Sequence, residues 1–243
     1  MRTERGTDGL RKVNMITGVN RYAEGSCMIW MGDTQVLCTA SAEPKTPSWM
    51  SQGSGGWITA EYAMLPRANR QRVPREAKTG RPTGRTQEIS RLIGRSLRAC
   101  TDLSGLEGWT VTVDCDVLQA DGGTRCAAVT GGYVALAQAL EGLVADGSLP
   151  KNPLTAPVAA VSVGLLDGEV LLDLCYAEDC AADVDLNLVM LPEGRIVEVQ
   201  GTAEGAPFDR GLLDRMLDLG EAGIIRLMAL QQNVLAGSGG KTP

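Results

Sequence analysis

The chain has 243 residues, a net charge of −6 and no histidine, with enough apolar residues to form a core without disulfide bonds or metal ions. The absence of histidine excludes Ser-His-Asp and Cys-His nucleophilic triads and the usual histidine-bearing metal sites. The 7 cysteines form no CxxC pair, so we expect reduced, mostly buried thiols rather than a disulfide framework or a zinc ribbon.

The N-terminal residues do not form a charged-then-apolar leader, and no run of eighteen apolar residues follows. We therefore expect a cytoplasmic protein with no membrane segment. Two strand-like runs, 27–30 and 35–40, are joined by Gly32-Asp33, a strong hairpin signal. A third apolar run, 57–65, predicts another strand.

Arginine is concentrated in one stretch of this acidic chain. Residues 67–98 hold ten basic and two acidic side chains, a charge of +8, which leaves −14 for the remainder. This asymmetry indicates either a local anion-binding surface or a solvated charged loop. From residue 86 to 100, apolar residues recur at helical spacing, which predicts an amphipathic helix with Arg91, Arg95 and Arg98 on its polar side.

Residues 109–118 alternate between apolar and polar side chains and predict a strand. The sequence Asp-Gly-Gly-Thr-Arg, 121–125, follows and leads into an Ala-rich helix that ends near Asp146-Gly147. Paired glycines and free helix-start amides suit an anion. On these residues alone, however, an ordinary turn with Thr124 as helix cap is the favoured interpretation.

The second half predicts strands over 158–166 and 169–178 with a hairpin at Asp167-Gly168, then strands over 184–191 and 195–205, and a helix over 208–235. The hairpins at 27–43 and 186–205 resemble each other, which suggests duplicated β-rich units with helices. We therefore predict an α+β fold in a single domain, 1–235, followed by a disordered tail, 236–243.

Two groups of carboxylates are candidates for chemistry: Asp114 and Asp116 with nearby Asp121, and the segment 178–187. In an extended run Asp183, Asp185 and Asn187 share one face, toward which Asp179 can lean. Such groups bind a divalent cation or pair with distant arginines. No Walker A or GxGxxG loop occurs. Arginines, an amide-rich turn and carboxylates together suit phosphoryl transfer.

Several long segments, taken in order and spacing, resemble the bacterial ribonuclease PH family over residues 1 to about 235. They are EGSCMIWMGDTQVLCTASAE, GWITAEYAMLPRA, GRTQEISRLIGRSLRA, DCDVLQADGGTRCAAVTG, LDLCYAEDCAADVDLNLVM and GRIVEVQGTAEGAPF. Polynucleotide phosphorylase and the exosome core subunits share that fold. The chain is similar to the single-domain enzyme, because it contains no repeated copy of these segments.

The resemblance implies phosphorolysis, in which inorganic phosphate attacks the terminal linkage of an RNA 3′ end and releases a nucleoside diphosphate, with transfer-RNA precursors as substrates. It implies magnesium or manganese as cofactor and a homohexameric ring built as a trimer of dimers. One departure is Cys126, where relatives more often have threonine. The implied roles are phosphate binding by Arg85, Gly123, Thr124 and Arg125, catalysis and metal binding by Asp179 and Asp185, and RNA binding by Arg67, Arg70, Arg72 and Arg75.

Two other classes of function stay open. In the first, the chain is a non-catalytic RNA-binding ring subunit of an exosome-like assembly. The presence of both Arg125 and Asp185 argues against it, because a scaffold does not need them. In the second, the chain binds a small phosphorylated molecule, which the extended arginine segment disfavours.

Overall fold

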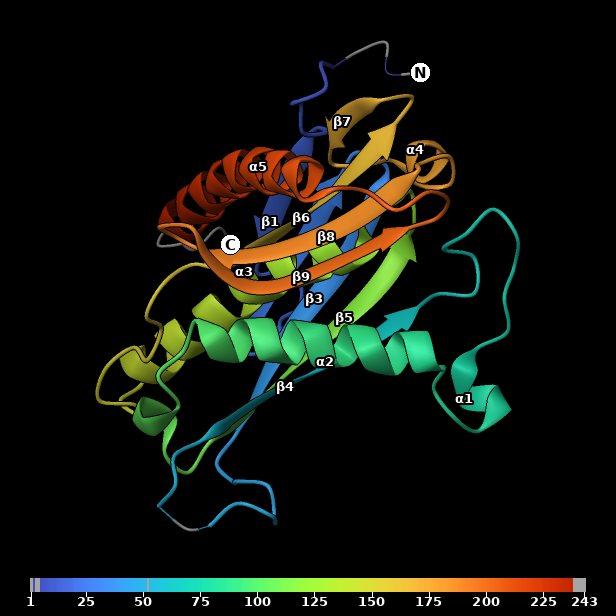
Figure 1. Ribbon diagram of the computed structural model, residues 1–243. Coiled ribbons are helices and arrows are strands. Elements are labelled where there is room, and N and C mark those ends of the chain that lie inside the picture. The colour runs from blue at the N-terminus through green and yellow to red at the C-terminus, as the bar shows by residue number, and fades with distance from the viewer. Residues whose placement is uncertain (1, 3–4, 52, 238–243) are drawn as a thin grey trace.

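The computed structural model describes residues 2, 5–51 and 53–237 (Figure 1). Its first sheet has the strand order β1-β2-β3-β5-β4, in which only the β4–β5 pair is parallel. The strands are β1 (Val13–Thr17), β2 (Gly25–Met31), β3 (Thr34–Glu43), β4 (Trp57–Met64) and β5 (Thr110–Gln119). The hairpin predicted at Gly32-Asp33 joins β2 to β3 and is confirmed.

The second sheet has the antiparallel order β7-β6-β8-β9. Its strands are β6 (Ala159–Leu166), β7 (Glu169–Leu172), β8 (Val184–Leu191) and β9 (Arg195–Ala203). Strand β8 is central, with Asp185 opposite Gly164 of β6 and Asn187 opposite Gln200 of β9. The polar face of β8 therefore lies in the middle of the sheet rather than at an edge.

Helices fill the space between and around the sheets (Figure 1). Helix α3 (Thr124–Ala145) contacts β2 and β3 of the first sheet and β6 of the second. Helix α2 (Gly84–Ala99) covers β4, and α5 (Arg210–Gly237) packs on β6 and β8. Three short helices complete the chain: α1 (Glu76–Thr79), η1 (Leu103–Leu106) and α4 (Tyr176–Asp179). The α+β class is confirmed.

Helix α3 is apolar on nearly every side because both sheets cover it. By length and composition alone it could cross a membrane. However, 78% of its most apolar 18-residue stretch is buried inside the protein. An added Cβ at Gly131 would come within 2.7 Å of Ile29 Cγ2, so this glycine permits the close approach of α3 to β2. One core cluster includes side chains from both sheets and α3.

Several details of the sequence prediction are wrong. The strand predicted over 169–178 ends at Leu172, because Asp173 has a φ of 55° and the chain turns into α4. Thr124 is not a helix cap, since Gly123 occupies the N-cap position. Arg98 lies 4.4 Å from the centroid of the Trp57 ring and donates to the Ile58 carbonyl, instead of extending into solvent. Strand β1 and the short helices α1 and η1 were not expected. The predicted tail begins inside α5, which continues to Gly237, and residues 238–243 lie outside the described residues.

Candidate active site

A cavity of about 550 Å³ opens at the N-terminus of α3, where the first sheet, α2, α4 and β8 meet. The residues predicted to bind phosphate and those predicted to act in catalysis line this one cavity. It is lined by Arg85, Gly122, Gly123, Thr124, Arg125, Asp179, Asp185 and Asn187, with further contributions from Tyr62, Met64, Asn69, Val73, Pro74, Glu76, Thr83, Thr86, Ala120, Ser162 and Tyr176. The structure thus brings together side chains from both halves of the chain.

The turn before α3 depends on its two glycines. Gly122 and Gly123 have φ angles of 76° and 65°, in a backbone region that residues other than glycine rarely adopt. A Cβ at Gly122 would lie 2.6 Å from the Leu174 carbonyl oxygen. The Thr34 hydroxyl donates to the Gly122 carbonyl over 2.7 Å. The Gly122 carbonyl is thus already paired. The first amides of α3 have no acceptor within the helix, and such amides are suited to an anion.

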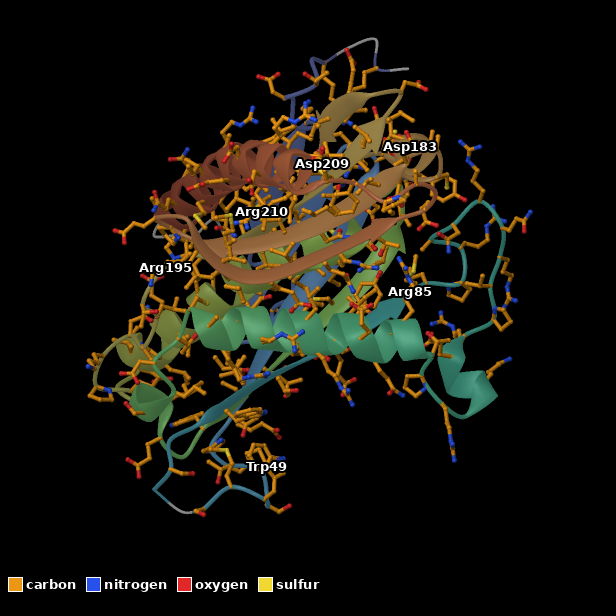
Figure 2. All side chains as sticks on the ribbon, in the orientation of Figure 1. Trp49, Arg85, Asp183, Arg195, Asp209 and Arg210 are labelled. Atoms are coloured by element: carbon orange, nitrogen blue, oxygen red, sulfur yellow. The ribbon has the colours of Figure 1, made fainter. Side chains whose placement is uncertain are left out.

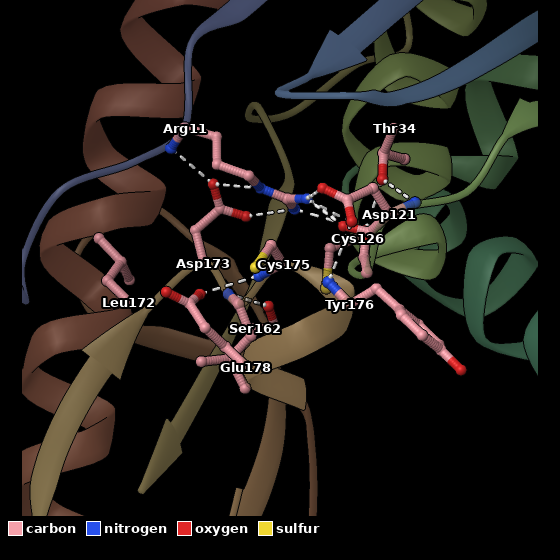
Figure 3. A network of polar contacts seen from close by, with 12 residues as sticks. Arg11, Thr34, Asp121, Cys126, Ser162, Leu172, Asp173, Cys175, Tyr176 and Glu178 are labelled. Atoms are coloured by element: carbon pink, nitrogen blue, oxygen red, sulfur yellow. Dashed lines mark hydrogen bonds and ion pairs between the residues drawn. The ribbon is translucent and has the colours of Figure 1, made fainter. Parts of the chain in front are cut away.

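Behind this turn lies a buried ion network (Figure 3). Arg11 Nη2 is 2.7 Å from Asp173 Oδ1, and its Nε donates to Asp173 Oδ2 over 3.1 Å. Arg11 Nη1 donates to the carbonyl oxygen of Asp121, at the start of the turn. Burial acts to lower the pKa of Arg11, but Asp173 outweighs it and holds the pKa above its ordinary value. Arg11 therefore joins the turn of the first half to the β7–α4 connection of the second.

The same network holds α4 in place. Glu178 accepts from Arg2 Nε over 2.7 Å and from Arg5 Nη2 over 3.0 Å, and it caps the helix by accepting from the Cys175 amide. Burial alone would raise the pKa of Glu178, but these arginines and the amide lower it. Because Glu178 precedes Asp179, its contacts fix the short helix that carries this cavity-lining carboxylate.

Two arginines supply the positive charge of the cavity. Arg125 lies in the first turn of α3 and donates to Gln200 Oε1 of β9, while Gln200 Nε2 donates to Glu88 Oε1 over 3.1 Å. Arg85 lies in the first turn of α2 and is exposed (Figure 2). Both arginines act to lower the pKa of Asp179, which burial raises. Both guanidinium groups are therefore close enough for their charges to act on Asp179.

Asp185 is the most perturbed carboxylate of the cavity. Burial and the neighbouring Asp179 raise its pKa to about 6, against the opposing effects of Arg125 and Asn187. Asn187 Nδ2 donates to Asp185 Oδ2 over 3.4 Å. The other oxygen, Oδ1, is buried and has no hydrogen-bond partner among the described residues. Because an unsatisfied buried carboxylate oxygen is costly, this atom is suited to a ligand or a proton.

Neighbouring side chains hold the site in place. The Tyr62 hydroxyl donates to Thr124 Oγ1 over 2.9 Å, in a buried contact between β4 and α3. The Cys126 thiol donates to Asn187 Oδ1 over 3.3 Å. Burial raises the pKa of Cys126 to about 12, so the group is a neutral donor. Cys126 thus fills its position with a thiol that orients the amide beside Asp185.

The carboxylates fit a divalent cation only as part of a larger ligand set. Among the described residues there is no group of three or more Cys, Asp or Glu that could hold a metal ion. Asp179 and Asp185 line the same cavity, and Asp185 Oδ1 lacks a partner among those residues. Magnesium commonly uses one or two carboxylates together with waters and substrate phosphates. The donor set is compatible with that arrangement.

The remaining carboxylates have other surroundings. Asp114 and Asp116 alternate with the buried residues of β5, so they lie on the face of the first sheet that is directed away from α3. Asp121 accepts from the Tyr176 amide over 3.3 Å and lies 3.8 Å from Arg11. Asp183 is exposed, immediately before β8, and is not among the cavity residues.

The four arginines predicted to bind RNA do not line the cavity. Arg67, Arg70, Arg72 and Arg75 are exposed in the segment between β4 and α1. Their neighbours Asn69, Val73 and Pro74 do line it. The arginines therefore lie at the surface, in the segment whose other residues line part of the cavity.

Several residues of the site were not found from the sequence. Arg11 and Asp173 are separated by 162 positions, and Tyr62 has the pattern of an ordinary inward residue of a strand. Gln200 lies in an alternating strand, where a polar side chain is unremarkable. One available signal was the aspartate at position 173 within a run of leucines.

Comparison with known proteins gives a consistent result. The model of the 3′ exoribonuclease family, domain 1, matches residues 9–140, and that of domain 2 matches residues 156–223. The chain is 56% identical over 231 residues to a ribonuclease PH of Moorella thermoacetica, covering 95% of this chain and 92% of the relative. It is 54% identical over 235 residues to a ribonuclease PH of Exiguobacterium sibiricum, covering 97% and 94%.

Solved structures agree with the fold. A structure of the Archaeoglobus fulgidus exosome with RNA bound to the active site matches with a TM-score of 0.76 and 26% identity, over 92% of this chain and 89% of that chain. An archaeal exosome core matches with a TM-score of 0.75 and 24% identity, over 94% and 89%. The family models cover both halves of the chain, and the two relatives match it over nearly its whole length. The chain therefore belongs to the 3′ exoribonuclease family and is a member of its ribonuclease PH group.

Proposed function

We propose that the chain is a phosphate-dependent 3′-to-5′ exoribonuclease that releases nucleoside diphosphates. The observation that carries the proposal is that one cavity joins the amide-rich turn at Gly123 to the carboxylate of Asp185. The turn and the neighbouring Arg85 and Arg125 suit an inorganic phosphate, since guanidinium groups bind phosphate through several parallel donors. The family relationship supports the same reaction.

The protein must hold the attacking phosphate and supply a proton to the leaving oxygen. The attacking phosphate oxygen forms a bond to the phosphorus of the terminal linkage, and the bond from that phosphorus to the leaving 3′ oxygen breaks. Thr124, Arg125 and Arg85 hold the attacking phosphate and neutralise its charge. The leaving oxygen takes a proton, for which Asp185 is the donor, because its raised pKa of about 6 keeps part of it protonated near neutral pH.

Asp179 and Asp185 would hold a magnesium or manganese ion, which when bound would neutralise charge on the phosphates. These carboxylates come from α4 and β8 and line the same cavity as Arg85 and Arg125, which supports this role. The contacts of Glu178 fix Asp179, and those of Asn187 fix Asp185.

The test is incubation of the purified protein and magnesium with a labelled RNA, with and without inorganic phosphate. Release of nucleoside diphosphates only when phosphate is present supports the proposal, and release of monophosphates or of nothing overturns it. Arg85→Ala should raise the KM for phosphate on the order of tenfold, as expected for loss of hydrogen bonds to a charged group. Arg91→Ala is the matched control, because Arg91 is exposed on the same helix outside the cavity.

We further propose that the substrates are transfer-RNA precursors and that Arg67, Arg70, Arg72 and Arg75 contact the RNA backbone. Their exposure beside the cavity supports this role. Replacing all four with Gln should weaken RNA binding and reduce its dependence on salt, by a slope of about 0.7 for each phosphate that the variant no longer neutralises. The KM for phosphate should stay near that of the unaltered chain. A variant that binds RNA with unchanged salt dependence would contradict the assignment.

We also propose a homohexameric ring, a trimer of dimers, as the assembly. Light scattering coupled to size-exclusion chromatography measures it directly, and a monomer at micromolar concentration would overturn it. The alternative function, a non-catalytic ring subunit, predicts the same assembly without diphosphate release, so the two measurements together separate the functions.

A further inference from the structure

Tyr176 has an unusual environment for a large aromatic side chain. Its side chain lines the cavity while the residue is 54% exposed. The backbone amide is bound to Asp121 Oδ1, and Figure 3 shows the ring extending away from the buried ion network. Packing therefore does not account for the ring, although its main chain is held firmly at the phosphate turn.

Tyr176 lies on the same short helix as Asp179, one of the two carboxylates of the cavity. Tyr176 and Asp179 are the first and last residues of α4, three positions apart, so their side chains lie on one side of the helix. The contacts of Glu178 with Arg2 and Arg5 fix that helix. The backbone of Tyr176 is therefore fixed on the helix that carries Asp179, and both residues line the cavity.

The cavity that Tyr176 lines is partly apolar. Met64, Val73 and Pro74 line the same cavity as Tyr176, and Val73 is 40% exposed. The other lining groups include Arg85, Arg125 and the glycine turn, which are suited to phosphate. The neighbouring Cys180 side chain raises the pKa of the Tyr176 hydroxyl, while the charge of Arg70 acts to lower it. A ligand with one anionic end and one flat apolar end matches such a cavity, and a nucleotide has this chemistry.

We propose that Tyr176 is the platform on which the base of the 3′-terminal nucleotide stacks. The inference rests on the proposed exoribonuclease function and adds to it a subsite for the base. Stacking on an aromatic ring is tolerant of sequence because every base has a π face. The subsite therefore holds the terminal nucleotide without selecting its identity, as an enzyme that removes successive nucleotides requires.

The test combines protein and RNA changes in one cycle. A fluorescent single-stranded RNA and the same RNA with an abasic 3′-terminal nucleotide are titrated with the protein in the absence of phosphate. For the unaltered chain, loss of the base should weaken binding on the order of tenfold. Tyr176→Ala should weaken binding of the intact RNA by a similar factor and show no further loss with the abasic RNA. Tyr176→Phe should bind as the unaltered chain does, because the stacking face remains.

The matched control is Tyr22→Ala. Tyr22 is 80% exposed, packs beside Arg21 and is not among the cavity residues, so both RNAs should bind to this variant as to the unaltered chain. Additive losses in the cycle, or equal binding of both RNAs by the unaltered chain, would overturn the stacking proposal. Because binding is measured without phosphate, that result is separate from diphosphate release, whose failure would overturn the proposed function instead.

Discussion

Substitutions in the buried pair Arg11–Asp173 should change the stability of the fold and the KM for phosphate in different ways. The Asp173 side chain is fully buried and accepts from the backbone amide, Nε and Nη2 of Arg11. Removing one partner of a buried ion pair typically costs 3–5 kcal/mol, because the other charge stays buried and unpaired. In Arg11→Met the backbone amide still donates to Asp173, so we expect a loss near the lower end, about 3 kcal/mol.

At about 2–4 °C per kcal/mol for a chain of this size, Arg11→Met should lower the melting temperature by roughly 6–12 °C. Adding Asp173→Asn removes the buried charge, and asparagine tolerates the φ of 55° at this position. The double variant should therefore regain much of the lost stability. Thermal unfolding of the two variants and the unaltered chain measures both effects.

Function should not recover with stability. Neither variant restores the donation from Arg11 to the Asp121 carbonyl, which holds the turn before Gly123. We therefore expect the KM for phosphate to remain raised in the double variant, by several fold, while binding of RNA to the exposed arginines is retained. A double variant that recovers both the melting temperature and the phosphate KM would refute the role of Arg11 in holding the turn. Unchanged stability in Arg11→Met would refute the energetic reasoning.

Two further substitutions test other contacts. Tyr62→Phe removes the donor to Thr124 and should cost about 1 kcal/mol of stability, measured by chemical denaturation, with a modestly raised phosphate KM. Asp114→Asn should stabilise the fold at neutral pH by an amount on the order of 0.5 kcal/mol, because burial and the opposing Glu61 raise the pKa of Asp114 above its ordinary value of 3.8. A carboxylate with a raised pKa destabilises the fold once it is ionised, so the gain should disappear as the pH falls below 3.8; a gain that persists there would contradict this cause.

Local sequence patterns predicted most of the elements but failed where a tertiary contact controls the backbone. Alternation predicted β5 correctly, since Val111, Val113 and Val117 all face the core. The same kind of pattern extended β7 too far, because the run of leucines continues past Asp173. The chain leaves the sheet there to place the Asp173 carboxylate against Arg11, which lies 162 positions away. No local periodicity carries that information.

The sequence predicted the cavity-lining arginines and aspartates of the candidate site. It did not predict the residues that hold those side chains in position. The motif resemblance placed Arg85, Arg125 and Asp185 in one site, and one cavity contains all three. The supporting contacts of Tyr62 and Gln200 are hydrogen bonds between elements that are distant in the sequence. Such contacts leave no pattern in a single sequence, because either residue alone is unremarkable in a strand.

The site depends on both halves of the chain, and α3 explains how they are joined. Its N-terminus supplies Thr124 and Arg125, whereas Asp185 comes from β8 in the second sheet. Since both sheets bury α3, and Gly131 allows contact with Ile29 at a fixed register, the helix has little freedom to slide or rotate. The packing of α3 in the core consequently brings its first turn into the same cavity as the carboxylates of Asp179 and Asp185. This is why an almost wholly apolar helix begins with a polar turn that faces the cavity, and why neither half alone contains the complete set of groups.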